Sequence, residues 1–141
     1  MTEQRSPRQV HVRRVGPGRF TAVNERGGEI QVSTGDDAYF SPVELLLTAI
    51  GACTAADVDA VTSRRAEPDT FDVDVTATKL RDDDGNRLTD IEVTFKVSFP
   101  EGADGDKARA VLPDIVARSH DRLCTVGRTV ELGTPISPTI A

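Results

Sequence analysis

The chain has 141 residues and a mass of 15.2 kDa, the size of one domain or of one subunit of an oligomer that shares its core. Hydrophobic residues make up 38% of the sequence and charged residues 28%, which is usual for a soluble globular protein. The net charge of −6 argues against a surface that neutralises phosphates, so we expect no nucleic-acid partner.

Neither a targeting signal nor a membrane span is expected. Residues 1–8 carry charges with no apolar core behind them, unlike a signal peptide. No stretch approaches the roughly 18–20 apolar residues of a membrane span. We therefore expect a cytoplasmic protein with no membrane partner, in a compartment that disfavours a permanent disulfide but permits a transient, catalytic one.

The first third of the chain predicts a three-stranded meander. Residues 1–9 are polar and are expected to fray. Three short runs of strand-favouring residues follow, separated by glycine-containing turns, at residues 10–15, 19–23 and 29–33. A loop is expected from residue 33 to residue 40.

A helix is predicted to begin at Ser41. Serine is a good N-cap, Pro42 suits the first helical position, and Glu44 can complete a capping box. Residues 45–60 are apolar on nearly all sides, which predicts a central, buried helix.

The second half of the chain predicts two strands, a helix and a last strand. Alternating apolar and polar residues favour strands at 71–78 and 91–99, joined by a charged connection at 81–87. The spacing of apolar residues favours a helix from about 106 to 118. Pro113 inside it predicts a kink or a break. A final strand is expected at 129–132.

The only two cysteines, Cys53 and Cys124, fall in the first helix and just after the second one. Taken singly, each is more often a packed or idle thiol than a reactive one. Asp57 lies one helical turn after Cys53, where an isolated carboxylate would raise the thiol pKa. An active Cys53 therefore requires an arginine or comparable donors nearby.

His120 precedes Cys124 by four residues and offers two further interpretations, both disfavoured. A metal site made of His120, Cys124 and Cys53 lacks the closely paired ligands of a zinc site. A Cys/His acyl-transfer pair lacks an orienting partner for His120 other than Asp121. We expect neither a metal nor a cofactor.

Two segments together, residues 41–54 around Cys53 and residues 119–126 around Cys124, resemble the OsmC/Ohr family: osmotically inducible protein C and the organic hydroperoxide resistance proteins. The strand order on either side also agrees, so the resemblance covers residues 10–134. It implies an α+β fold in a single OsmC-like domain spanning residues 1–141, with antiparallel sheets and two long central helices. It also implies an intertwined homodimer with two sites at its interface.

The resemblance further implies thiol-dependent reduction of hydroperoxides, organic ones preferred, in oxidative-stress defence. Cys53 would attack the peroxide as a thiolate and become a sulfenic acid. Cys124 would convert the sulfenic acid to a disulfide. An external dithiol, either a lipoyl protein or a low-molecular-weight thiol, would restore both cysteines. An arginine would stabilise the thiolate and the leaving alkoxide.

The sequence departs from the family pattern at the groups that would activate Cys53. The well-studied peroxidases place a glutamate ten residues before the first cysteine, where this chain has Val43. Glu44 is either the displaced catalytic carboxylate or only a helix cap. Arg19 is the positional choice for the catalytic arginine, and Arg26 is the alternative. These departures motivate a second hypothesis, a redox-responsive binding protein with little turnover, and a third, a structural dimer with two idle thiols.

Overall fold

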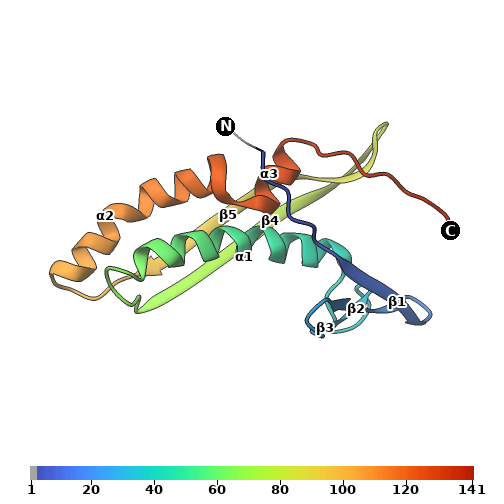
Figure 1. Ribbon diagram of the computed structural model, residues 1–141, viewed down its shortest axis with the longest axis horizontal. Coiled ribbons are helices and arrows are strands. Elements are labelled where there is room, and N and C mark those ends of the chain that lie inside the picture. The colour runs from blue at the N-terminus through green and yellow to red at the C-terminus, as the bar shows by residue number, and fades with distance from the viewer. Residues whose placement is uncertain (1–2) are drawn as a thin grey trace. The chain divides into compact units, whose positions relative to one another are not determined.

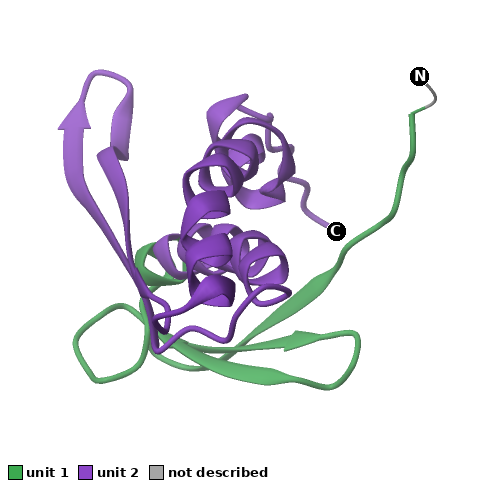
Figure 2. Ribbon diagram, turned by 90° about the vertical axis from the view of Figure 1, so that its left-hand side faces the viewer, with its two compact units in different colours: residues 1–46 green, residues 47–141 purple. Residues whose placement is uncertain are grey.

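The computed structural model describes residues 3–141, and the chain divides into two compact units, residues 1–46 and residues 47–141 (Figure 2). Residues 3–9 have no regular secondary structure, and residues 1 and 2 of the expected N-terminal arm lie outside the described residues. The remaining elements, labelled in Figure 1, are in chain order β1 (Val10–Gly16), β2 (Arg19–Asn24), β3 (Glu29–Ser33), α1 (Pro42–Thr62), β4 (Thr70–Asp82), β5 (Gly85–Ser98), α2 (Ala103–Arg118), η1 (Ser119–Leu123) and α3 (Thr125–Glu131).

The first unit contains the antiparallel meander that the sequence predicts. The strands pair in the order β1-β2-β3, with Ala22 of β2 opposite both Val12 of β1 and Ile30 of β3. Gly18 and Gly27 take positive φ angles of 65° and 87° in the two turns, a conformation that side chains disfavour. The predicted meander is therefore confirmed.

The start of α1 is set by the predicted capping box. The backbone N–H of Glu44 donates to Ser41 Oγ at 3.1 Å, and the N–H of Ser41 donates to Glu44 Oε1 at 2.9 Å. The helix begins at Pro42, as the sequence indicates. The two hydrogen bonds satisfy amide groups that have no partner inside the helix.

The second unit contains a long hairpin whose strands extend beyond the sequence prediction. β4 and β5 pair in an antiparallel ladder from Thr70 opposite Ser98 to Asp82 opposite Gly85. The connection expected over residues 81–87 is thus wrong in length, because most of it is paired strand. An ion pair of 2.9 Å between Arg87 and Asp82 holds the charged residues across the ladder.

Helices α1 and α2 lie side by side along one face of this hairpin (Figures 1 and 2). The backbone of α1 lies close to β4 at Gly51, where an added Cβ would lie 2.7 Å from a methyl group of Val75. Val58 of α1 and Ala108 of α2 are fully buried, and Ile115 is nearly so. These residues form the core that fixes the two helices.

The expectation that α1 is buried on nearly all sides is wrong for this chain taken alone. Only five of its 21 residues are buried, and the side chains of Val43 and Leu46 are 44% and 39% exposed. By length and composition alone, α1 is also apolar enough to cross a membrane, contrary to the sequence-based statement that no stretch approaches such a span. Core helices of soluble proteins meet the same two criteria, so the observation is weak evidence for a membrane.

The end of the chain differs from the prediction. α2 is one uninterrupted helix across Pro113, so the expected break does not occur. Residues 129–132, expected as a strand, belong largely to the helix α3 and its C-cap. The N–H of Arg128 donates to the carbonyl of Cys124 at 2.8 Å, and Gly133, with φ of 64°, lies just past the helix end. A capped start and a glycine stop therefore outweigh the alternating pattern of the sequence.

Candidate active site

Cys53 and Cys124 lie beside each other, although they come from α1 and from the start of α3. Both are free thiols. Burial raises the pKa of Cys124, and a side-chain hydrogen bond with Cys53 raises it further. Cys124 is 3% exposed, whereas Cys53 is partly exposed. The fold thus brings the two predicted cysteines together.

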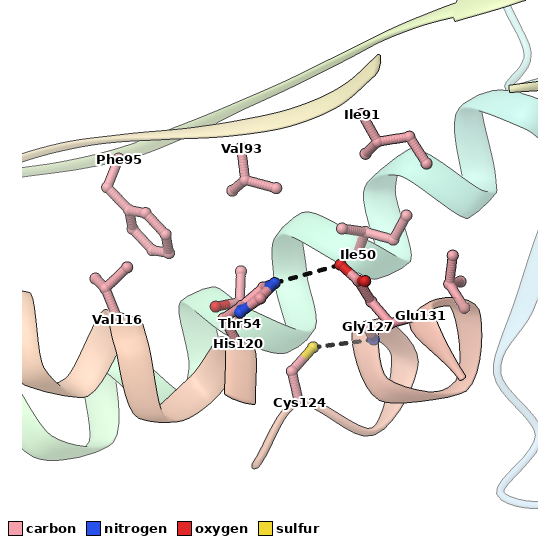
Figure 3. A pocket seen from close by; sticks show the side chains of 11 residues that line it. Ile50, Thr54, Ile91, Val93, Phe95, Val116, His120, Cys124, Gly127 and Glu131 are labelled. Carbon is pink, nitrogen blue, oxygen red and sulfur yellow. Dashed lines mark hydrogen bonds and ion pairs between the residues drawn. The ribbon is translucent and has the colours of Figure 1, made fainter. Parts of the chain in front are cut away.

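A π-helical turn places Cys124. The N–H of Cys124 donates to the carbonyl of Ser119 at 2.9 Å, which closes η1 with one residue more than an α-helical turn. Cys124 then caps α3, where its sulfur accepts a hydrogen bond from the N–H of Gly127 at 3.3 Å (Figure 3). This donor lowers the pKa of Cys124, but burial is the larger influence and the pKa is raised overall.

A polar network links α1 to the turn before Cys124. Ser119 Oγ donates to Asp57 Oδ2 at 2.8 Å and lies 2.7 Å from Thr54 Oγ1. Ser119 is fully buried and Thr54 is 8% exposed. The sequence suggested that Asp57 would act on Cys53. In the structure its carboxylate accepts the Ser119 hydroxyl, and its charge contributes to the raised pKa of Cys124, after burial and the contacts with Cys53.

Cys124 forms part of the wall of a pocket of about 320 Å³. Most of the wall is apolar, and the side chains of Ile91, Val93 and Phe95 point from β5 toward the helices (Figure 3). The pocket is lined by Ile50, Thr54, Ile91, Val93, Phe95, Val116, His120, Cys124, Gly127, Val130 and Glu131. Such walls suit an alkyl or aryl group held next to a thiol.

His120 is a polar residue of the pocket wall, and both of its ring nitrogens lie close to carboxylates. Its Nδ1 lies 2.9 Å from Asp121 Oδ1, and its Nε2 lies 3.3 Å from Glu131 Oε1 (Figure 3). The hydrogen bonds with Asp121 and then with Glu131 raise the pKa of His120 above its ordinary value. The sequence identified only Asp121 as a partner, because it placed Glu131 in a strand.

The predicted arginines belong to the first unit, where each has local interactions. The guanidinium of Arg19 lies 3.8 Å from Asp37 and 5.3 Å from the centroid of the Tyr39 ring. A hydrogen bond from Ser33 lowers the pKa of Asp37, and the charge of Arg19 also contributes. Arg26 lies in the turn between β2 and β3.

Glu44 also belongs to the first unit and takes part in the capping box with Ser41. This geometry accounts for a glutamate at this position on structural grounds. The sequence left two roles open for Glu44, a helix cap and a catalytic carboxylate, and this geometry corresponds to the helix cap.

Several residues of the site were not identified from the sequence, notably Thr54, Ser119 and Gly127. Thr54 and Asp57 are three residues apart, so they lie on one face of a largely apolar helix. Buried polar groups require hydrogen-bond partners, and this pattern is a signal for a polar contact with another element. The sequence contains no comparable signal that the partner is Ser119.

The fold and the site define an α+β protein with two adjacent free thiols, of which that of Cys124 lines an apolar pocket. The chain matches the OsmC-like protein family over residues 35–139, and it therefore belongs to that family. An uncharacterised protein of Mycobacterium tuberculosis is 31% identical over 130 residues, which cover 92% of this chain and 93% of the relative.

Solved structures share the fold. An OsmC-like protein of unknown function from Vibrio cholerae superposes with a TM-score of 0.73 at 14% identity, covering 90% of this chain and 95% of the other. The organic hydroperoxide resistance protein OhrB of Bacillus subtilis superposes with a TM-score of 0.54 at 16% identity, covering 88% and 90%. At these identities the two matches establish the fold, including its antiparallel sheets, and not the activity.

Proposed function

We propose that this protein is a thiol-dependent peroxidase that reduces organic hydroperoxides through Cys53 and Cys124 in oxidative-stress defence. The observation that carries the proposal is the adjacency of two free thiols, one of which, that of Cys124, lines an apolar pocket. Membership of the OsmC-like family supports it, as does the fold shared with an organic hydroperoxide resistance protein.

The proposed cycle begins at Cys53. Its thiolate attacks one peroxide oxygen, the O–O bond breaks, and the other oxygen leaves as an alkoxide that takes up a proton. Cys53 becomes a sulfenic acid. The thiol of Cys124 then forms the S–S bond and water leaves. An external dithiol reduces the disulfide and is itself oxidised to a disulfide.

The order of the two cysteines follows from their surroundings. Burial, Cys53 and Asp57 all raise the pKa of Cys124, which disfavours its thiolate as the attacking group. Cys53 is the more exposed of the two. We therefore assign the attack to Cys53 and the resolving step to Cys124.

The groups that activate Cys53 remain part of the proposal. Arg19 is the first choice for the guanidinium that stabilises the thiolate and the alkoxide, and Arg26 is the alternative. Glu44 is the candidate for the carboxylate that orients it.

We further propose that the working form is a homodimer. Large apolar side chains are exposed in several elements, which supports an interface between two copies. They include Val12 at 58%, Val43 at 44%, Ile91 at 36% and Leu123 at 43%. Sedimentation at micromolar concentration is expected to give a dimer, and a folded monomer would contradict this assembly.

Peroxide consumption tests the activity. Wild-type protein with dithiothreitol is expected to consume cumene or tert-butyl hydroperoxide faster than dithiothreitol alone. Cys53→Ser is expected to abolish the difference. Cys124→Ser is expected to leave a sulfenic acid at Cys53 that dimedone traps. A wild-type rate equal to that of the free dithiol excludes the peroxidase.

One observation favours a second candidate, a redox-responsive binding protein with little turnover. The carboxylate of Glu44 is engaged in the capping box, so its availability for catalysis is reduced. For this candidate, stoichiometric peroxide would oxidise the pair to a disulfide, but added dithiol would not sustain turnover. The same peroxide assay separates the two.

A further inference from the structure

Ser119 joins the segment that carries Cys124 to the helix that carries Cys53. Its hydroxyl donates its one proton to Asp57, so the hydroxyl of Thr54 must be the donor in the 2.7 Å contact with Ser119 Oγ. Its carbonyl accepts the N–H of Cys124 at 2.9 Å. Through these three hydrogen bonds, the fully buried Ser119 connects the segment that carries Cys124 to the helix that carries Cys53.

The partners of Ser119 on α1 flank Cys53. Thr54 is the next residue in the chain, and Asp57 follows one helical turn later. A shift of Ser119 relative to these two residues would carry the backbone amide of Cys124 with it. Because a disulfide tolerates only narrow ranges of distance and dihedral angle, the position of Ser119 bears directly on whether the sulfurs can bond.

We propose that Ser119 is a positioning residue: held by Asp57 and Thr54, it places Cys124 in bonding geometry with Cys53 and so stabilises the disulfide between them. The inference rests on the proposed function in taking this disulfide as the oxidised state. Ser119 touches neither peroxide nor reductant in this proposal, and it acts through Cys124 alone.

The contribution of Ser119 to the stability of the disulfide is expected to be measurable in a thiol–disulfide equilibrium that contains no peroxide. In glutathione buffers the two protein thiols and one glutathione disulfide convert to the protein disulfide and two glutathione thiols. Ser119→Ala is expected to lower this equilibrium constant by about tenfold, equivalent to about 30 mV toward a more oxidising potential for a two-electron couple. Mass spectrometry after alkylation measures the oxidised fraction.

Two threonines of α1 supply a matched pair of variants. Thr54→Val removes a hydroxyl that contacts Ser119, whereas Thr62→Val removes the hydroxyl of another buried threonine, which bonds the carbonyl of Val58 in the same helix. Thr54→Val should shift the equilibrium in the same direction as Ser119→Ala, and Thr62→Val should not. The pair also tests the proposal if Ser119→Ala fails to fold.

Asp57→Asn separates positioning from charge. The amide oxygen can still accept the Ser119 hydroxyl, so the equilibrium constant should stay near the wild-type value. The loss of the carboxylate charge should lower the pKa of Cys124, since Asp57 helps to raise it. A fall of the equilibrium constant as large as in Ser119→Ala would assign the effect to charge and overturn the proposal.

An unchanged equilibrium constant in folded Ser119→Ala would also overturn it, as would an equal shift in Thr62→Val. The proposed function is contradicted by a different result, a rate of peroxide consumption no higher than that of the free dithiol. A protein without peroxide turnover can still show these shifts, and peroxide turnover with an unshifted Ser119→Ala contradicts the positioning role alone.

Discussion

His120 Nε2 lies 3.3 Å from Glu131 Oε1, so a side chain of η1 is tied to the last residue of α3 beside the pocket that contains Cys124. Asp121 holds the other ring nitrogen at 2.9 Å. Two carboxylates thus flank one imidazole, and the interaction depends on the protonation of that imidazole.

The contacts of His120 predict a pH-dependent stability. Asp121 and Glu131 raise the pKa of His120 above the ordinary value of about 6.5. The folded protein therefore binds the proton more tightly than the unfolded chain. The stabilisation is fully present below about pH 6.5 and is lost as the pH rises through the raised pKa. Because the side chain is 64% exposed, the effect should be less than about 1 kcal/mol.

Urea unfolding of wild type and His120→Gln at an acidic and an alkaline pH checks this sign. The variant should be less stable than wild type near pH 5.5, about one unit below the ordinary pKa. The difference should vanish near pH 9. A proton NMR titration gives the pKa directly, and His11→Gln assigns the resonances, since the chain has two histidines. A difference that grows with pH would contradict the prediction.

Cys124 should alkylate with a pH profile displaced to high pH. Burial raises its pKa, and Cys53 and Asp57 add to this. Iodoacetamide reacts with the thiolate, so the midpoint of the rate profile for the Cys124 peptide should lie above the ordinary thiol value of about 8.5. Protein unfolded in urea is the control and should give the ordinary value. A native midpoint at or below that of the unfolded chain would show that burial does not dominate.

Gly51→Ala should destabilise the protein despite the higher helix propensity of alanine. The new Cβ would lie 2.7 Å from a methyl group of Val75, a short side chain with little freedom to withdraw. Overpacking costs about 1–3 kcal/mol, against a gain in propensity of about 1 kcal/mol. Urea unfolding measures the difference. Val75→Ala should be less harmful in the Gly51→Ala background than alone, and additive effects would refute the clash.

The capping box predicts distinct effects for two substitutions of Glu44. Glu44→Ala should lower the free energy of unfolding by about 1 kcal/mol, because the amide of Ser41 loses its acceptor. Glu44→Gln retains an acceptor oxygen for the amide of Ser41, so the free energy of unfolding should stay near that of wild type. Peroxide turnover of the same variant should fall, because the carboxylate proposed to orient the guanidinium loses its charge. Unchanged turnover in Glu44→Gln would leave Glu44 with the capping role alone.

The fold was predictable where short-range chemistry determines structure. The capping box at Ser41 and the glycine turns of the meander are local patterns, and the structure confirms both. Residues 129–132 misled because β-branched residues and alternation favour a strand, whereas Cys124 as a cap and Gly133 as a stop favour a helix. The strand-favouring and helix-favouring signals in this segment therefore conflicted, and the structure has the helix.

The site was predictable only in part, because it depends on contacts between distant segments. The pairing of Cys53 with Cys124 came from the resemblance to a family, since no periodicity relates the two positions. The partnership of Ser119 with Asp57 spans 62 residues and has no counterpart in local pattern. Arg19 and Arg26 were identified from their place in the meander, and their relation to the cysteines stays a prediction.

The π-helical turn that ends in Cys124 makes the site sensitive to the count of residues as well as to their identity. The number of residues between Ser119 and Cys124 determines where the turn places the cysteine. If residues 119–124 formed an ordinary α-helical turn instead, the N–H of Leu123 would bond the carbonyl of Ser119, and Cys124 would lie about 100° farther around the helix axis. The extra residue of η1 is therefore what brings Cys124 beside Cys53.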